Sequence, residues 1–273
     1  MFDSILTFER TKLIPFLMVG YPNLEASEQL AMTMIESGIE VLELGVPFSD
    51  PMADGKVIQM ASAKALSCGT TLKDVLALCG RIHQQHPHVK LIIFSYLNPL
   101  LAFGLSRYVQ EAHSVGVAAS LTVDLPPEEA EEYLMFHQNA NLKTVFLASP
   151  TTSKDRIKLI SEYSTAFIYY ISRLGVTGAQ NNLSSSLDLE LNKIKSLTNK
   201  PIAVGFGVSN CEQIKYLSQR AQGVVVGSAL VKIITESPSL KEAQMSIRDF
   251  LISGQEVINN NLLKNYSAQT SMT

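Results

Sequence analysis

The sequence predicts an α/β fold, a single (β/α)8 (TIM) barrel formed by residues 1–273, and three observations lead to this prediction. Eight short apolar or β-branched segments recur along the chain, and their starts lie 22 to 50 residues apart. A parallel strand with its crossover helix needs about that length, whereas a hairpin needs far less. Some segments, such as Leu91-Ile92-Ile93-Phe94, are continuously apolar, as strands covered on both faces are. The chain length of 273 residues also suits a fold of about 250 residues.

The strands are expected, in order, at residues 13–19, 39–44, 89–95, 118–123, 143–148, 167–172, 201–204 and 223–226. The first interval predicts a helix over residues 25–37, because Leu30, Met34 and Ile35 recur at helical spacing. This helix is expected to end at Gly38, since glycine suits the C-terminal cap.

Later intervals predict helices over residues 105–115, before Gly116, and over residues 128–139, after two prolines that favour a helix start. The long interval after the second strand holds an inserted loop, residues 47–55, and a helix over residues 72–86. In this fold, loops at the carboxyl ends of the strands carry the active site. The polar segment from Gly254 onward is expected to end in poorly ordered residues.

An open, doubly wound sheet is the alternative fold. That fold usually has fewer strands and places a glycine-rich, phosphate-binding turn after its first strand. Here the first strand ends in Val19-Gly20-Tyr21-Pro22, which lacks that fingerprint. The sequence therefore favours the barrel.

Composition excludes several classes of protein. With 22 basic and 25 acidic residues and no basic block, a nucleic-acid partner is not expected. No apolar run reaches the roughly 18 residues that cross a bilayer, and Asp3 stands where a signal peptide carries bases. The three cysteines form no CxxC pair, and no HExxH motif is present, so no metal site is expected. We expect a cytoplasmic protein.

Glu43 is the first candidate catalytic residue, because it lies inside an apolar strand on the same face as Ile39 and Val41. Loss of hydration raises the pKa of a buried carboxyl group and keeps it a proton donor near neutral pH. The alternative is that Glu43 pairs with a buried base and only holds the barrel together. Glu40, at the start of the strand and on the opposite face, is expected to be a surface charge.

Asp54 is the second candidate, in a loop between Pro51 and Gly55. One carboxylate on a strand and one on a loop allow proton transfer at two atoms of one substrate. The alternative is an Asx turn before Gly55. Asp50, which precedes Pro51, is expected to form a turn or to bind a partner.

Glycine-bearing turns follow the last three strands: Gly175-Val176-Thr177-Gly178, Gly205-Phe206-Gly207 and Gly227-Ser228. Glycines let backbone N–H groups approach an anion closely, and phosphate sites in this fold follow the late strands. Ser228 is expected to cap the next helix. The three turns together predict a phosphate site, although each alone is a common strand-to-helix turn.

The segment Glu-Leu-Gly-Val-Pro-Phe-Ser-Asp-Pro-Met-Ala-Asp-Gly, residues 43–55, closely resembles the signature of the tryptophan synthase α subunit family. The resemblance continues through Tyr96-Leu97-Asn98-Pro99, Asp124-Leu125-Pro126 and the glycine turns, and it covers nearly the whole chain in order. It implies a barrel that splits indole-3-glycerol phosphate into indole and glyceraldehyde 3-phosphate by a retro-aldol reaction without a cofactor.

The resemblance also implies roles for individual residues. Glu43 would protonate indole C3 and assist deprotonation of the glycerol hydroxyl, and Asp54 would hold the ring N–H. The indole pocket would be walled by Phe16, Phe94, Tyr169 and Phe206, with Thr177 near Asp54, and the phosphate would be held by Gly178, Gly207, Gly227 and Ser228.

The implied partner is a pyridoxal-phosphate β subunit in an α2β2 heterotetramer, which receives indole through a tunnel. Four residues match positions at the contact with that subunit: Asp50, Pro51, Asn98 and Pro99.

The chain departs from the family pattern after Asp54-Gly55, where Lys56 replaces the usual proline. Lys56 is expected to loosen the loop and to favour the ionised form of Asp54. Met60 and Ser62 stand where asparagines are common. A catalytically weak subunit that mainly activates a β partner is therefore one alternative, and another phosphate-sugar barrel enzyme of the same pathway is a second.

Overall fold

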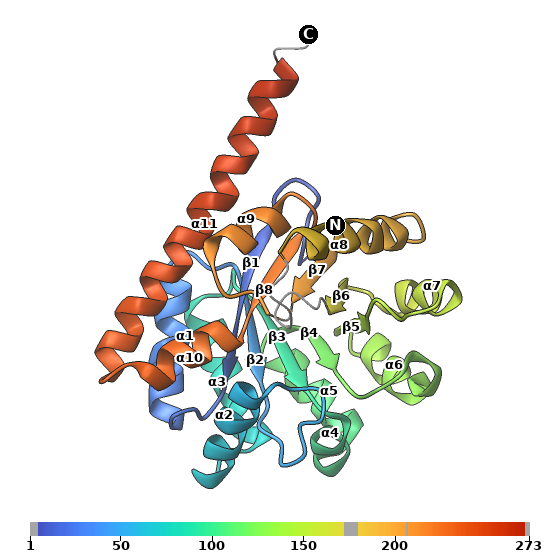
Figure 1. Ribbon diagram of the computed structural model, residues 1–273. Helices are drawn as coiled ribbons and strands as arrows, with labels where there is room; N and C mark the ends of the chain where they lie inside the picture. The colour runs from blue at the N-terminus through green and yellow to red at the C-terminus, as the bar shows by residue number, and fades with distance from the viewer. Residues whose placement is uncertain (1–4, 172–179, 206, 271–273) are drawn as a thin grey trace.

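The structure is a computed structural model that describes residues 5–171, 180–205 and 207–270, with the backbone alone for residues 180–186 and 262–270. Eight parallel strands close into a barrel in chain order (Figure 1). The strands are β1 Lys12–Met18, β2 Val41–Gly45, β3 Lys90–Ser95, β4 Val117–Thr122, β5 Lys143–Ala148, β6 Phe167–Ile171, β7 Ile202–Gly205 and β8 Gly223–Val226. The predicted (β/α)8 barrel is confirmed, and every strand begins and ends within two residues of the predicted bounds.

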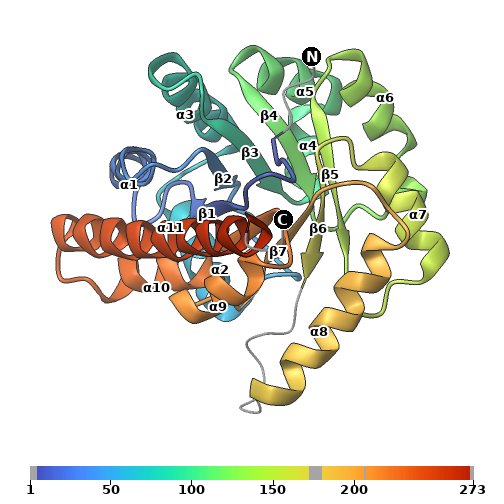
Figure 2. The same cartoon turned by 90° about the horizontal axis from the view of Figure 1, so that it is seen from above.

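Helices surround the barrel on the outside (Figures 1 and 2). They are α1 Leu24–Glu36, α2 Lys56–Ser67, α3 Leu72–Gln85, α4 Leu97–Phe103, α5 Leu105–Ser114, the short 3-10 helix η1 Pro127–Glu129, α6 Glu131–Asn139, α7 Lys154–Tyr163, α8 Gln180–Lys195, α9 Cys211–Ser218, α10 Ser228–Glu236 and α11 Leu240–Thr270. The helix predicted over residues 128–139 is divided into η1 and α6 at Ala130. No helix among the described residues is long and apolar enough to cross a membrane.

Local sequence explains where several helices begin. The side chains of Asn23, Ser153 and Asn210 each accept a hydrogen bond from a first-turn N–H group, which caps α1, α7 and α9. Thr71 and Asp74 form a reciprocal capping box at the start of α3. Strands β2, β7 and β8 are buried along their whole length, because side chains fill the barrel inside and helices cover it outside.

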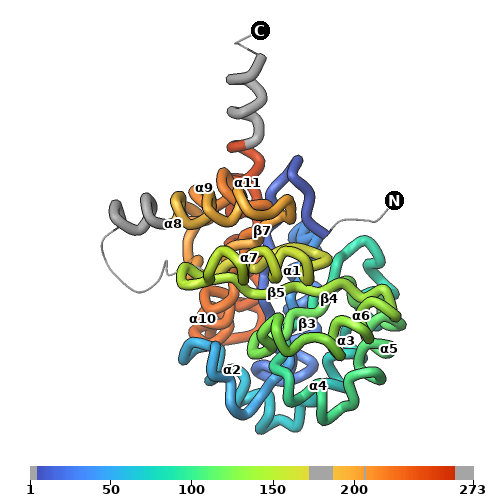
Figure 3. The backbone as a smooth tube through the Cα atoms, turned by 90° about the vertical axis from the view of Figure 1, so that its right-hand side faces the viewer, coloured from blue at the N-terminus to red at the C-terminus, as the bar shows by residue number. Residues whose placement is uncertain are grey.

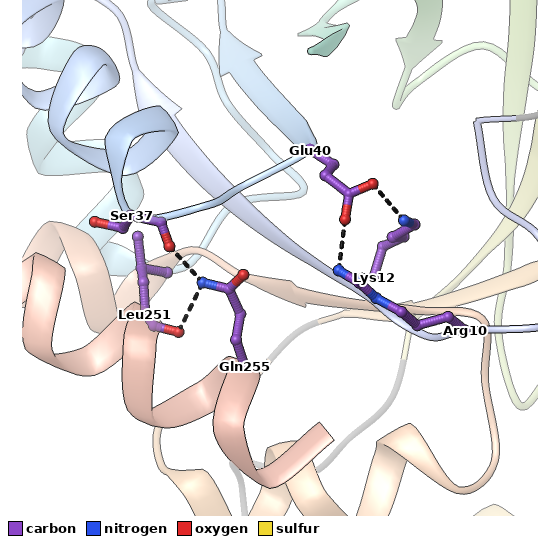
Figure 4. Close-up of polar contacts among 6 residues, drawn as sticks. All are labelled: Arg10, Lys12, Ser37, Glu40, Leu251 and Gln255. Carbon is purple, nitrogen blue, oxygen red and sulfur yellow. Dashed lines mark hydrogen bonds and ion pairs between the residues drawn. The ribbon is translucent and has the colours of Figure 1, made fainter. Parts of the chain in front are cut away.

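Ion pairs join β1 to the start of β2 at the amino ends of the strands (Figure 4). Glu40 accepts hydrogen bonds from Arg10 and from Lys12, both at 2.5 Å. Partial burial acts to raise the pKa of Glu40, but the hydrogen bond and charge of Lys12, with Arg10, outweigh it and lower that pKa. The Glu40 side chain is 42% exposed, so it is a surface charge, as expected from the sequence, and its ion pairs also link β1 to the start of β2.

Helix α11 runs along the end of the chain. It continues through Gly254 to Thr270. Residues 271–273, the last of the chain, lie outside the described residues, so the expectation that the chain ends in poorly ordered residues stays a prediction. It packs against α9, α1 and α10 (Figure 3). Gln255 on α11 donates a hydrogen bond to the carbonyl oxygen of Ser37 at 2.7 Å, which ties α11 to the end of α1 (Figure 4).

Candidate active site

Glu43 lies in the middle of β2, in register with Phe16 on β1 and Ile92 on β3. Its side chain is 1% exposed, and its Oε1 has no hydrogen-bond partner among the described residues. Burial, and secondly the charge of Asp54, raise the pKa of Glu43 to about 8. No base contributes to this shift, so the alternative of a structural ion pair finds no support. A pKa of about 8 favours the neutral carboxylic acid form of Glu43 near pH 7.

Asp54 is half-buried on the segment between β2 and α2. The hydroxyl of Tyr96, just after β3, donates to Asp54 Oδ2 at 3.1 Å and accepts from the N–H of Ala53 at 3.0 Å. Burial raises the pKa of Asp54 to about 6, although the Tyr96 hydrogen bond acts to lower it. The carboxylate is thus oriented by Tyr96 rather than by an Asx turn, and Lys56 is not among the causes of the shift, contrary to our expectation.

Both carboxylates line one cavity of about 250 Å³ at the carboxyl ends of the strands. Eight of the predicted site residues come together there: Phe16, Glu43, Asp54, Phe94, Tyr169, Gly207, Gly227 and Ser228. The structure adds Gly55, Lys56, Val57, Ile58 and Val225, which sequence reasoning did not assign to the pocket. Three predicted residues, Thr177, Gly178 and Phe206, lie outside the described residues.

Aromatic rings form one wall of the cavity. Phe16 and Phe94 meet edge to face, with ring centroids 5.3 Å apart. Gly45 makes room for them, because a Cβ there would lie 2.5 Å from Phe16 Cζ. Gly205 makes room for Tyr169 in the same way, since a Cβ would lie 2.2 Å from its hydroxyl oxygen. These two glycines therefore leave room for the aromatic side chains that line the cavity.

The amino end of α10 also lines the cavity. Gly227 is the N-cap residue and Ser228 is the first helical residue, so the prediction that Ser228 caps this helix is wrong. No side chain caps α10, and the first-turn N–H groups of a helix have no partner inside the helix. Such an end binds anions, and phosphate in particular. Gly207 lies beside it with a φ of 85°, a conformation that favours glycine.

The segment that carries Asp54 is anchored on both sides. The ring of Phe48 stacks on Tyr96 with centroids 5.1 Å apart. Ser62 of α2 donates to the carbonyl oxygen of Phe48 at 2.9 Å and accepts from its N–H at 2.8 Å. Sequence reasoning missed these anchors. The available signal was a tyrosine placed directly after a buried strand, next to the loop of the candidate acid.

The residues predicted at a partner contact lie on the segment before α2 and on α4. Asp50 and Asn98 are exposed, and Pro51 and Pro99 are partly exposed. Two large apolar side chains stand exposed on the same two segments, Met52 at 93% and Leu101 at 50%. Among the described residues, no group of His, Cys, Asp or Glu side chains is arranged to hold a metal ion.

Comparisons with known proteins show the family of this chain. A family model described as Tryptophan synthase alpha chain matches residues 2–259. The chain belongs to the tryptophan synthase alpha chain family. It is therefore a lyase that cleaves indole-3-glycerol phosphate, as the resemblance implied.

Individual relatives are similar over most of their length. The tryptophan synthase alpha chain of Geotalea uraniireducens is 43% identical over 235 residues, which cover 86% of this chain and 88% of that protein. The alpha chain of Solibacter usitatus is 39% identical over 250 residues, 92% of this chain and 93% of that protein.

Solved structures of the family share the fold. Tryptophan synthase subunit alpha of Legionella pneumophila superposes with a TM-score of 0.85 at 33% identity, covering 92% of this chain and 93% of that one. A chain of Mycobacterium tuberculosis tryptophan synthase gives a TM-score of 0.83 at 32% identity, with the same coverage.

Proposed function

We propose that Glu43 and Asp54 carry out the cleavage of indole-3-glycerol phosphate as a retro-aldol reaction that yields indole and glyceraldehyde 3-phosphate. One observation carries this proposal: two carboxyl groups with different pKa values line one cavity that has aromatic walls and an uncapped helix end. General acid catalysis needs a proton donor that is still protonated near the working pH, and Glu43 meets that requirement.

Glu43 acts first as the acid. It transfers its proton to C3 of the indole ring, and the positive charge that this creates extends to the ring nitrogen. Asp54, ionised near neutral pH, accepts the ring N–H and stabilises that charge. The Glu43 carboxylate then takes the proton of the hydroxyl group on the adjacent glycerol carbon. The bond from C3 to that carbon breaks, its electrons return to the ring, and the carbon becomes the aldehyde.

The cavity orients the substrate for these steps. Phe16, Phe94 and Tyr169 hold the ring, while Gly207, Gly227 and Ser228 receive the phosphate at the amino end of α10. Thr177, Gly178 and Phe206 keep the roles that the family resemblance implies for them. The steps need no cofactor on this chain, because the proton that Glu43 gives up returns to it.

We also propose that the chain works with a β subunit that carries pyridoxal phosphate, in an α2β2 heterotetramer. The exposed residues Asp50 and Asn98, together with Met52 and Leu101, offer a mixed polar and apolar surface beside the cavity. The cytoplasm is the expected compartment.

Release of indole from indole-3-glycerol phosphate tests the proposal, measured for the isolated chain and with saturating β subunit. We expect cleavage in both cases, with a higher rate in the complex. Cleavage that is absent alone and stays near zero in the complex, combined with stimulation of the β reaction, would instead support the alternative of a weak activating subunit.

A further inference from the structure

Lys56 is a feature of this cavity that the mechanism above does not use. It is the first residue of α2, it is exposed, and it lines the cavity together with Gly227 and Ser228. Among the described residues that line the cavity, it is the one basic side chain. In the family pattern this position is usually proline, so a role of Lys56 would belong to this chain rather than to the family.

The charge of Lys56 is not neutralised inside the described part of the protein. Asp54 is two residues away, but it takes its hydrogen bond from Tyr96, and no ion pair joins it to Lys56. Lys56 forms no ion pair with any other described residue either. Because Lys56 forms no ion pair with Asp54, its ammonium group can bind an anion that enters the cavity.

The backbone around Lys56 adds to this positive character. Helices α2 and α10 pack against each other, and the amino ends of both line the cavity. Each has a glycine as its N-cap, Gly55 and Gly227, and neither N-cap has a side chain to occupy the first-turn N–H groups. Neither helix carries an acidic residue in its first turn, although Asp54 directly precedes the N-cap Gly55 of α2.

We propose that Lys56 binds the phosphate group of the substrate and makes this enzyme discriminate for a doubly charged phosphate over a neutral ligand. This inference rests on the proposed placement of the phosphate at the amino end of α10. The two helix ends supply N–H donors, and Lys56 supplies the full positive charge that the backbone cannot. Its contribution is to substrate affinity, because Lys56 lines the cavity together with Gly227 and Ser228 at the amino end of α10, while the proton transfers occur at Glu43.

The test measures binding directly, by calorimetry with the full-length chain and two probes: rac-glycerol 3-phosphate, which is an anion, and indole, which is neutral. Lys56→Met removes the charge and keeps the length of the side chain, and Lys56→Arg keeps the charge. Lys64→Met is the matched control, since Lys64 is an exposed basic residue of the same helix that does not line the cavity.

Lys56→Met is expected to weaken glycerol phosphate binding about threefold to tenfold, to leave indole binding unchanged within about twofold, and to reduce the salt dependence of phosphate binding. Lys56→Arg and Lys64→Met are expected to stay within about twofold of the unmodified chain. In turnover, Lys56→Met is expected to raise KM with kcat nearly unchanged.

Equal affinity of Lys56→Met and the unmodified chain for glycerol phosphate at low salt would overturn the inference, and so would an equal loss in Lys64→Met. A failure of the proposed mechanism gives a different result: the unmodified chain would bind glycerol phosphate tightly and yet release no indole.

Discussion

Glu43 and Asp54 have different pKa values because their surroundings differ. Glu43 is enclosed by the barrel and lacks a partner for Oε1, whereas Asp54 is half-buried and hydrogen-bonded to Tyr96. Their pKa values are raised to about 8 and about 6. Between these values, the protonated acid and the ionised carboxylate that the mechanism needs exist together.

These pKa values predict a bell-shaped dependence of kcat/KM on pH. Activity should fall below about pH 6, as Asp54 gains a proton, and above about pH 8, as Glu43 loses one. Because the two carboxyl groups interact, the apparent pKa on each side of the pH profile belongs to the pair rather than to one residue. Indole release between about pH 5 and pH 10 measures the profile. A rate that keeps rising above pH 9 would mean that Glu43 does not act as the acid.

Substitutions of Gly227 can separate the effect of side-chain size from the effect of negative charge on phosphate binding. A Cβ at this position would lie 3.5 Å from Phe16 Cβ, an ordinary contact, so the fold tolerates a side chain there. Gly227→Asp should raise KM about tenfold or more by placing a negative charge against the phosphate, whereas Gly227→Ala should change it much less. Steady-state kinetics of both variants measure this. Similar KM values for Gly227→Asp and the unmodified chain would place the phosphate elsewhere.

The candidate acid Glu43 could be predicted from the sequence, because it interrupts an apolar strand. Asp54 was less certain, since a common turn explained it equally well before the family resemblance. The contact between Tyr96 and Asp54 could not be predicted, because it joins residues 42 positions apart through the fold. The predicted N-cap residue of α10 was wrong for a local reason. Serine often caps helices, but here the helix begins one residue earlier, with Gly227 as the N-cap residue.

At the scale of elements, the strands were predictable because buried parallel strands are short, apolar and regularly spaced. Helix α11 was not predicted. Its buried residues, Ala243, Ile247, Leu251 and Ile258, do recur at helical spacing. Gly254 and the run Asn259-Asn260-Asn261 conceal this pattern, because glycine and asparagine are poor helix formers.

Substitution of Gly254 tests how closely α11 packs against β1 and α9. A Cβ here would lie 3.0 Å from Leu13 Cδ2 and 3.1 Å from Ile214 Cδ1, so the helix approaches the barrel closely at this point. Gly254→Leu should lower the free energy of unfolding by about 1–3 kcal/mol through overpacking. Ser253→Leu, at an exposed position of the same helix, should stay within about 0.5 kcal/mol. Urea denaturation measures the free energy of unfolding of both variants. Equal losses in the two variants would contradict close packing of α11 at Gly254.

At the scale of the whole molecule, the surface that carries Asp50, Asn98 and Leu101 lies beside the cavity and is expected to receive the β subunit. Leu101→Asp should weaken β-subunit binding at least tenfold, because it places a charge in the apolar part of that surface. Met135→Asp on α6 is the matched control, since Met135 is 48% exposed and Leu101 is 50% exposed. Titration with labelled β subunit compares the variants. Equal loss in both, or in neither, would remove this surface from the interface.

The barrel also bears the energetic cost of keeping Glu43 buried. The folded-state pKa of Glu43 is raised from 4.5 to about 8, so its contribution to stability is fully present below about pH 4.5 and is lost as pH rises toward 8. Glutamine has no charge to bury. The stability that the protein loses between pH 5 and pH 9 should therefore be smaller in Glu43→Gln, by on the order of 3 kcal/mol. Thermal unfolding at both pH values gives this difference and shows that the variant is folded.

Glu43→Gln also tests most directly whether a buried neutral carboxylic acid on β2 drives the cleavage. The measurement is indole release from indole-3-glycerol phosphate by the variant in the presence of β subunit, together with its affinity for the substrate. We expect kcat to fall about 100-fold to 10,000-fold while substrate affinity stays within about threefold, because an amide fills the same space but cannot donate the proton. Turnover within about tenfold of the unmodified chain would remove Glu43 from the mechanism.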